Sequence, residues 1–328
     1  MYQMMSLPLY SGTLGEYNSW RDLGQELERL GCDGIEGVWG GEDLPKDLPA
    51  ELILGYHLIF YPDWLDFYRD DRAALKQKFG SLEAVASFYG GLGPDTLLEQ
   101  YRADLRRAVN LGARYVVFHV SDVSLEEGYT YRWLHTNQEV IDAAVEVVNL
   151  ILGEERWPFE FLVENQWWPG FTFTEPEETA RLLEGIRFAG KGILLDTGHL
   201  MNACTELKTE AEGADYIRSM LNRHGSLAKW VRGVHLHQSL SGAYVKAHTG
   251  SLPAGLPEDY MERFGVSYQH ILQIDQHRPW TDPAILSVLE QIEPRYLTHE
   301  LSSRGRMARA EAVSIQTRLL RQGGRMRV

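Results

Sequence analysis

Three short stretches in the second half of the chain decide its fold class: GILLDTG (192–198), VRGVHLH (231–237) and RYLTHEL (295–301). Each contains an apolar run of strand length followed or interrupted by ionisable residues. Five similar stretches precede them, at 3–9, 32–38, 51–57, 113–120 and 159–165. Apolar runs of this kind are typical of strands that are covered on both faces, as in a parallel sheet. The sequence therefore predicts eight buried parallel strands.

Amphipathic stretches that predict helices separate most of these strands. EYNSWRDLGQELERLG (16–31) places Leu23, Leu27 and Leu30 on one helical face and ends in Gly31, a residue favoured at helix C-termini. Further helices are predicted at 94–112, 136–152, 176–186, 213–224, 282–291 and 306–321. Eight strand–helix units in 328 residues match the size of an α/β fold of the (β/α)8 TIM barrel type, expected as a single domain over 1–328. An open doubly wound sheet is the alternative, but no glycine-rich phosphate-binding turn follows the first strand.

Composition and charge narrow the class of protein. Hydrophobic residues make up 44% of the chain and charged residues 24%, which is typical of a globular protein in water. The formal net charge of −14 excludes a generally basic nucleic-acid coat. No apolar stretch approaches the 18 residues of a membrane span, and MYQMMSLPLY lacks the features of a signal peptide. With two cysteines in the chain, we expect a reducing, cytoplasmic location.

Two connections are longer than the others, at about 58–93 and 238–274, and both follow strand ends. In a barrel they would lie at the end where the strands' C-terminal residues meet, here called the mouth. The first connection carries acidic residues and the aromatic residues Phe60, Tyr61, Trp64 and Phe67. We interpret the aromatic residues as the lid of a small-molecule pocket in preference to wedges that enter DNA. A basic C-terminal helix and tail at about 304–328 is expected to form a solvated face.

Ionisable side chains of the kinds that bind metals fall at or near six of the eight predicted strand ends. They are His57, His119, Glu164, Asp196, His199, His235, His237 and Glu300, with Asp275 and His277 in the last long connection. The strand ends of a barrel converge on one mouth, so these side chains are expected to meet there. An unpaired buried charge costs several kcal/mol, and a bound cation offsets that cost. Mixed His, Asp and Glu ligands without cysteine suit Zn²⁺, Mn²⁺, Fe²⁺ or Co²⁺ better than Ca²⁺.

At these residues the sequence resembles the xylose isomerase-like TIM-barrel superfamily, also described as AP endonuclease family 2, over roughly 15–322. The motifs are GCDGIEGV with Glu36, LVEN with Glu164, LLDTGH with Asp196 and His199, GVHLH with His235 and THEL with Glu300. In isomerases and epimerases of this superfamily, the Glu, Asp, His and Glu that correspond to Glu164, Asp196, His235 and Glu300 bind one divalent metal. The resemblance therefore implies a metal site at Glu164, Asp196, His235 and Glu300.

Three further motifs resemble the endonuclease IV branch, which assembles three zinc ions. They are GYH at His57, VVFH at His119, and DQHRPW at Asp275 and His277. The resemblance implies that His57, His119 and Glu164 hold one metal. Glu164 would bridge to a second, completed by Asp196, His235 and Glu300. The third would lie between His199, Asp275 and His277.

Two enzymatic functions and one binding function remain open at this point. Two or three metals favour hydrolysis of a phosphoester, because metals lower the pKa of bound water and neutralise phosphoryl charge. One metal favours isomerisation or epimerisation of a sugar or sugar phosphate through an enediolate, with a carboxylate moving the proton. A barrel that binds a metal or a sugar without turnover is the third possibility. The presence of a matching residue type at all nine ligand positions favours the hydrolase.

The predicted roles follow from these functions. Glu164 and Glu300 are the expected catalytic residues, and Glu36, Trp167, His237 and Lys246 are expected to bind substrate. Lys246 is included because QSLSGAY, which follows the seventh strand, offers no arginine. Zinc is the expected metal, in up to three copies, with Mn, Fe, Co and Mg as alternatives. A small sugar or phosphoester is expected as the substrate in preference to DNA, and no membrane partner is expected.

Overall fold

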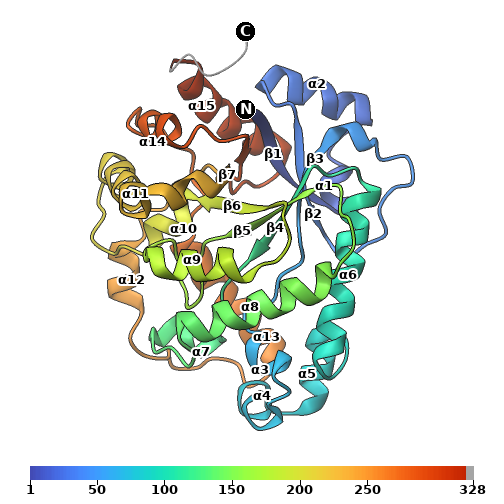
Figure 1. Cartoon of the computed structure of the whole chain (residues 1–328), viewed down its shortest axis with the longest axis vertical. Coiled ribbons are helices and arrows are strands. Elements are labelled where there is room, and N and C mark those ends of the chain that lie inside the picture. The colour runs from blue at the N-terminus through green and yellow to red at the C-terminus, as the bar shows by residue number, and fades with distance from the viewer. Residues whose placement is uncertain (323–328) are drawn as a thin grey trace.

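The strands close into a barrel in the computed structural model, which describes residues 1–322. The eight strands are β1 (Tyr2–Leu9), β2 (Gly34–Trp39), β3 (Ile53–His57), β4 (Tyr115–His119), β5 (Glu160–Glu164), β6 (Lys191–Asp196), β7 (Val231–His235) and β8 (Tyr296–His299). They pair in chain order, and the parallel pairing of β8 with β1 closes the ring (Figure 1). This confirms the predicted (β/α)8 TIM barrel and excludes the open sheet.

Helices follow nearly every strand and pack around the barrel. The larger ones are α2 (Trp20–Leu30), α6 (Pro94–Asn110), α8 (Asn137–Leu152), α9 (Pro176–Gly185), α11 (Glu210–His224), α14 (Ile285–Ile292) and α15 (Arg306–Gln322). Shorter ones are α1 (Ser11–Leu14), α7 (Leu125–Thr130), α10 (Thr197–Asn202) and the 3-10 helices η1 (Ala50–Leu52) and η2 (Gly225–Trp230). Residues 40–52, all of which are described, connect β2 to β3 with only η1 between them.

Local sequence signals explain where these helices begin and end. Ser19 caps the start of α2 by accepting a hydrogen bond from the Asp22 backbone N–H. The predicted C-terminal Gly31 adopts the left-handed conformation, with a φ of 80°, that glycine takes without strain. Thr136 and Glu139 form a capping box at the start of α8, so each side chain accepts from the other's backbone N–H.

The barrel interior is filled by a small apolar cluster below the mouth. It consists of Met4, Leu54, Tyr115, Val117, Leu162, Leu194 and Tyr296. The Tyr115 hydroxyl donates a 2.6 Å hydrogen bond to Glu36 on β2, which lies between this cluster and the strand ends. The cluster therefore forms a rigid floor beneath the side chains that point into the mouth.

The two long connections contain helices that cover the mouth. The first holds α3 (Leu65–Tyr68), α4 (Arg72–Phe79) and α5 (Leu82–Tyr89), and the second holds α12 (Gly242–His248) and α13 (Tyr260–Ile274). Figure 1 shows α3, α4, α5, α7 and α13 together at the end of the barrel opposite the N-terminus. The rings of Phe79 and Tyr260 stack with centroids 3.9 Å apart and join the two connections.

Two expectations about the first connection need correction. Trp64 and Phe67, expected in a lid, are almost fully buried in the core. The expected acidic mouth is partly neutralised, because Lys78 lies 2.7 Å from both Asp63 and Asp66 in a buried ion cluster. The sequence does not predict that α4 folds back so that Lys78 contacts Asp66 on α3.

The basic C-terminal segment differs in part from its expected role. Within α15, Arg306 pairs with Asp22 at 2.7 Å and with Glu26 at 2.9 Å, so it joins this helix to α2. In contrast, three other arginines of the segment are exposed as expected: Arg304, Arg318 and Arg321. The remainder of the predicted basic tail, 323–328, lies outside the described residues. None of the helices within residues 1–322 combines the length and the apolar character needed to cross a bilayer.

Candidate metal centre

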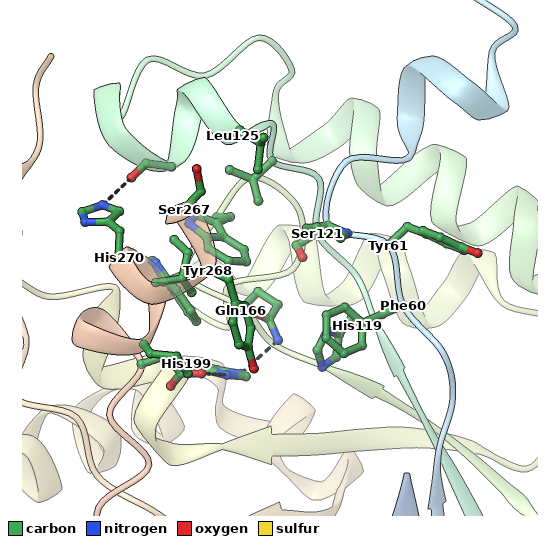
Figure 2. Close-up of a pocket in the computed structure, with 18 of the residues that line it drawn as sticks. Phe60, Tyr61, His119, Ser121, Leu125, Gln166, His199, Ser267, Tyr268 and His270 are labelled. Atoms are coloured by element: carbon green, nitrogen blue, oxygen red, sulfur yellow. Dashed lines mark hydrogen bonds and ion pairs between the residues drawn. The ribbon is translucent and has the colours of Figure 1, made fainter. Parts of the chain in front are cut away.

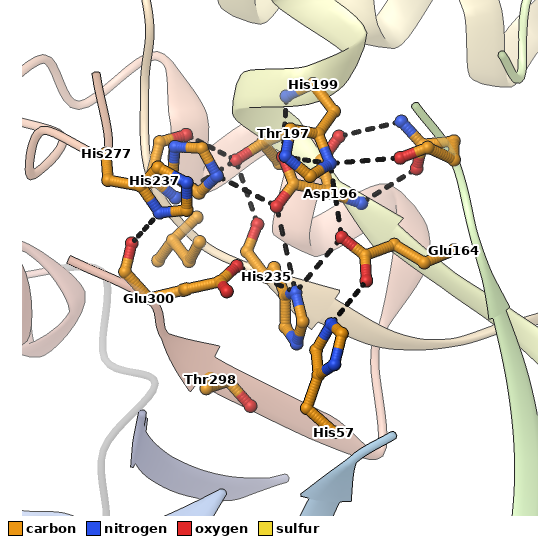
Figure 3. Close-up of polar contacts among 12 residues, drawn as sticks. His57, Glu164, Asp196, Thr197, His199, His235, His237, His277, Thr298 and Glu300 are labelled. Carbon is orange, nitrogen blue, oxygen red and sulfur yellow. Dashed lines mark hydrogen bonds and ion pairs between the residues drawn. The ribbon is translucent and has the colours of Figure 1, made fainter. Parts of the chain in front are cut away.

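The barrel register places the predicted ligands side by side at the mouth. On β4 and β5, His119 is paired with Glu164, and on β6 and β7, Asp196 is paired with His235. His57 ends β3, and Glu300 follows β8. Parallel strands with their C-terminal ends level therefore bring residues from all over the chain into one cluster (Figure 3).

Glu164 lies at the middle of this cluster, surrounded by four imidazole rings. Its Oε2 is 3.1 Å from His119 Nε2 and 3.4 Å from His57 Nε2. Its Oε1 is 3.1 Å from His199 Nδ1 and 3.4 Å from His235 Nδ1. The Glu164 side chain is fully buried, and neither of its carboxylate oxygens has a hydrogen-bond partner among the described residues. A buried carboxylate in this state requires a positive charge nearby.

The hydrogen bonds of His57 show that a cation fits this position. Its Nδ1 lies 2.8 Å from the backbone oxygen of Leu58 and must therefore carry the proton. In the neutral ring, Nε2 then holds a lone pair, which faces His119 Nε2 at 3.0 Å and the Glu164 carboxylate. Lone pairs on three converging groups repel one another unless a proton or a metal ion lies between them. A ring nitrogen bound to a backbone carbonyl is also the usual way to orient a metal-binding histidine.

Ligand atoms gather into three groups in which all atoms lie within 4.8 Å of one another. The groups are His57, His119 and Glu164; Glu164, Asp196, His235 and Glu300; and His199, His237, Asp275 and His277. The structure thus brings together all nine residues that were expected as ligands, in the three sets that the resemblance implied. Their role as ligands stays a prediction. His237, expected to bind substrate, joins the third group.

Contacts with the segments that follow β7 and β8 hold His277 in the third group. His277 Nε2 lies 2.6 Å from Asp275 Oδ2, while its Nδ1 lies 3.1 Å from the backbone oxygen of Glu300. The His237 and His277 rings stack with centroids 4.0 Å apart. The backbone of His277 has a φ of 46°, in the left-handed region that non-glycine residues seldom adopt. Strained backbone of this kind concentrates at functional sites.

The charges of the cluster shift the pKa values of its members strongly. Burial alone would raise the pKa of Glu164, but His119 and His235 hold it well below its usual range. Burial alone would lower the pKa of His235, yet the carboxylates of Glu300, Glu36 and Glu164 raise it well above the usual value. His277 follows the same pattern, because Asp275 outweighs burial and raises its pKa to about 9. The imidazoles thus attract positive charge, which either protons or divalent ions can supply.

Glu36 does not contact the mouth, which corrects its expected role in substrate binding. Its side chain is fully buried on β2, and its Oε1 lies 2.8 Å from His235 Nε2. Its Oε2 accepts hydrogen bonds from Tyr115 at 2.6 Å and from Thr298 at 2.9 Å. Glu36 therefore acts on His235 from below and is separated from any substrate.

Lys246 is not brought to the site either. It lies on α12, half exposed, with its Nζ 2.7 Å from Glu206. Trp167, in contrast, lies at the site: it is buried, and its ring centroid is 5.1 Å from that of His199. Of the residues expected to bind substrate, Trp167 is therefore the one that lines the cavity described next.

A cavity of about 450 Å³ opens above the candidate ligands (Figure 2). Its base includes His57, His119, His199, Asp275, His277 and Glu300, whereas Glu164, Asp196 and His235 lie beneath the surface. Its walls come from both long connections, from the segment after β4 that contains α7 and from the loop after β5, and no lysine or arginine within the described part of the chain lines it. This is the size of a small-molecule site.

Sequence reasoning missed several residues that hold the site in place. Asn165, next to Glu164, accepts from the Asp196 backbone N–H at 2.8 Å and donates to its carbonyl at 3.1 Å, which locks β5 to β6. Thr197 donates to the backbone oxygens of both His235 and His237. The only sequence signal for Asn165 and Thr197 is their position next to a candidate ligand. That position does not predict the hydrogen-bond partner that each finds on a neighbouring strand.

Comparisons with known proteins agree with this architecture. A family model described as xylose isomerase-like TIM barrel matches residues 25–319. No curated protein matches the sequence. Among solved structures, endonuclease IV from Thermus thermophilus is 15% identical, with a TM-score of 0.52 and coverage of 98% of this chain and 100% of that chain.

Two further solved structures have similar scores. L-ribulose 3-epimerase is 14% identical, with a TM-score of 0.52 and coverage of 98% of this chain and 94% of that one. The IOLI protein with a binding zinc atom is 16% identical, with a TM-score of 0.51 and coverage of 98% of both chains. At these identities the likeness shows the fold alone.

Proposed function

The chain belongs to the xylose isomerase-like TIM barrel family, and from its candidate metal centre we propose a divalent-metal-dependent hydrolase of phosphoesters with a multinuclear centre. The observation that carries this proposal is the continuity of the three ligand groups. Glu164 is shared by two of them. His199 links the third, with Nδ1 3.1 Å from Glu164 and Nε2 3.3 Å from Asp275.

The charge of the cluster supports several ions and an anionic substrate. The three groups contain four carboxylates, those of Glu164, Asp196, Asp275 and Glu300. Three divalent ions with neutral histidines would leave a surplus of two positive charges, which matches a phosphoryl group. One ion would leave a deficit of two, which repels a phosphoryl group and suits an uncharged sugar. Zinc is the metal we propose, since it takes His and carboxylate ligands in four-coordinate sites.

Bound ions would supply charge neutralisation for phosphoryl oxygens and a water with a pKa lowered toward neutrality. The protein residues divide the remaining tasks. His57 and His119 face the cavity with fixed ring orientation and would position the ions toward substrate. Of the two predicted catalytic carboxylates, Glu300 lines the cavity and Glu164 lies beneath it. We therefore assign proton transfer to Glu300 in addition to its place in the central ligand group, and ion binding alone to Glu164.

A mononuclear sugar isomerase or epimerase is the second candidate. The central group, Glu164, Asp196, His235 and Glu300, offers four ligands by itself, and its Glu300 lines the cavity. That arrangement is sufficient for one ion and a proton-transfer group. It leaves the two flanking groups without a function, which is why we place it second. A metal- or sugar-binding barrel without turnover is the third candidate.

Element analysis of the protein, purified without added metal, tests this proposal. A content of about three ions per chain, with hydrolysis of bis(4-nitrophenyl) phosphate, supports the hydrolase. A content of about one ion, with conversion of ketoses or their phosphates, supports the isomerase and contradicts our proposal. Failure to take up any ion after incubation with Zn²⁺, Mn²⁺, Fe²⁺ or Co²⁺ contradicts both enzymatic functions.

A further inference from the structure

We infer that the substrate is a phosphoester of an uncharged aromatic group, and this inference rests on the proposed function. The phosphoryl group would be bound at the base of the cavity, by the metal centre. The aromatic group would fill the space between the cavity walls. Two properties of the cavity carry this inference: its apolar walls and the lack of lysine and arginine among the described residues that line it.

The walls of the cavity are aromatic where they meet the candidate ligands. The Phe60 ring lies 4.5 Å, centroid to centroid, from the ring of His119. On the other side Trp167 lies 5.1 Å from His199 and packs against Trp168 at 4.2 Å. Ile271 of α13 also lines the cavity. A group attached to a phosphoryl at the base would therefore be in contact with apolar surface from its first atoms onward.

Two lysines of the long connections are already paired with carboxylates. Lys78 binds Asp63 and Asp66, and Lys246 binds Glu206. The guanidinium of Arg263 donates to the Lys78 backbone oxygen at 2.9 Å. No lysine or arginine of residues 1–322 lines the cavity itself. A second phosphate, as in a nucleic acid or a bisphosphate, would have to be desolvated there without a counter-charge.

Several polar side chains of the lining already have hydrogen-bond partners. Gln166 is within 3.0 Å of His199 Nδ1, and Ser124 caps α7 by accepting from the Glu127 backbone N–H. His270 contacts the Tyr244 hydroxyl at 3.0 Å and the Gly128 backbone oxygen at 3.2 Å. By contrast, the Ser267 hydroxyl is buried and has no hydrogen-bond partner in the described part of the chain. Neutral hydroxyl groups of Ser121, Tyr129, Ser267 and Tyr268 also line the cavity, and they suit neutral polar substituents on an otherwise apolar group.

Binding of three phosphorus probes to the metal-loaded protein, measured by calorimetry, tests the inference. The probes are inorganic phosphate, methylphosphonate and phenylphosphonate, none of which can be hydrolysed as an ester. Phenylphosphonate is expected to bind at least about tenfold more tightly than methylphosphonate, since each buried methylene-sized group contributes about fourfold. Equal binding of the two phosphonates overturns the inference and leaves the proposed function intact. Absence of binding by all three probes overturns the proposed function and the inference together.

A matched pair of substitutions on α13 locates the aromatic group. Ile271→Ser changes the cavity wall, whereas Val266→Ser changes an exposed position on the same helix that does not line the cavity. We expect Ile271→Ser to weaken phenylphosphonate binding by about tenfold and to leave phosphate binding unchanged. Val266→Ser should change neither. Equal loss of both ligands in Ile271→Ser, or an equal effect of the two substitutions on phenylphosphonate, contradicts the placement.

Discussion

Glu36 Oε1 lies 2.8 Å from Nε2 of His235, and both side chains are fully buried. The opposite ring nitrogen, Nδ1, lies 2.9 Å from Glu300 Oε2 and 3.4 Å from Glu164 Oε1. A carboxylate behind a histidine fixes the orientation of the ring and increases its basicity as a ligand. Glu36 is thus a positioning residue for the central group, although it contacts no candidate ion itself.

Glu36→Gln is therefore expected to weaken metal binding at the central group by about 10- to 100-fold. The measurement is competition with a chelator of known affinity, followed by element analysis. Glu160→Gln is the control, because Glu160 begins β5 at the other end of the barrel and pairs with Arg232 and Arg295. Unchanged metal affinity in Glu36→Gln would show that His235 is oriented without its help.

The sequence predicts which residues lie at the end of a strand, but it does not predict how far below the mouth a side chain lies. His119 and Glu164 end adjacent strands, so the register of a closed barrel places them together whatever the loops do. Glu36 lies before the end of β2 and below the ligands, and a motif does not specify that depth. Lys246 depends on how α12 turns toward Glu206, which spacing does not encode.

The helices of the first long connection were missed for a different reason. Hydrophobic periodicity does not define them, because α4 and α5 are each only eight residues long. Their signals were present, since Ser81 caps α5 and Gly90 ends it in the left-handed conformation. Short helices that pack on a mouth and not on a sheet need such capping signals, because their apolar face is too brief to define a period.

Gly198→Ala tests the position of His237 in the third group. A Cβ at position 198 would lie 2.0 Å from Cε1 of His237, so the ring must move away. We expect weaker binding of the ion at the third group and a fall of at least about tenfold in hydrolysis, because small misplacements of catalytic groups have large effects.

Gly24→Ala provides the matched control for this substitution. Gly24 lies inside α2, and a Cβ there would meet no atom within 4 Å. Alanine favours a helix interior over glycine, so this variant should keep full metal content and gain about 0.5–1 kcal/mol of unfolding free energy. Full metal content in Gly198→Ala as well would mean that His237 does not belong to the ligand set.

Glu300→Gln tests the assignment of proton transfer. Glu300 lines the cavity, and a glutamine in its place retains the shape of the side chain but cannot exchange a proton. Loss of general acid–base catalysis is expected to lower kcat by about 10²–10⁴-fold with little change in KM. The pH–rate profile should lose one limb. Glu164→Gln is expected to lose more bound metal than Glu300→Gln, because Glu164 belongs to two ligand groups and Glu300 to one, so equal metal loss in both variants would contradict the division of roles.

Asp66→Asn tests the buried ion cluster under α3 and α4, and its effect should depend on pH. Burial alone would raise the pKa of Asp66, but hydrogen bonds from His135 and Lys78 lower it from 3.8 to about 2. A carboxylate whose pKa is lower in the folded chain than in the unfolded chain stabilises the fold above the unfolded value. That contribution, about 2 kcal/mol, is lost as the pH falls from about 4 to about 2.

Asp66→Asn should therefore lower the free energy of unfolding by about 2 kcal/mol at pH 7, and the difference from the unsubstituted protein should shrink below about pH 4. Urea unfolding at pH 7, 5 and 3 measures this. Asp70→Asn is the control: its carboxylate is about half exposed and pairs with Arg72, and asparagine tolerates the positive φ of 51° found there. The control should stay within about 0.5 kcal/mol at every pH. A loss in Asp66→Asn that is equally large at pH 3 and pH 7 would mean that packing, and not the charge of Asp66, stabilises this cluster.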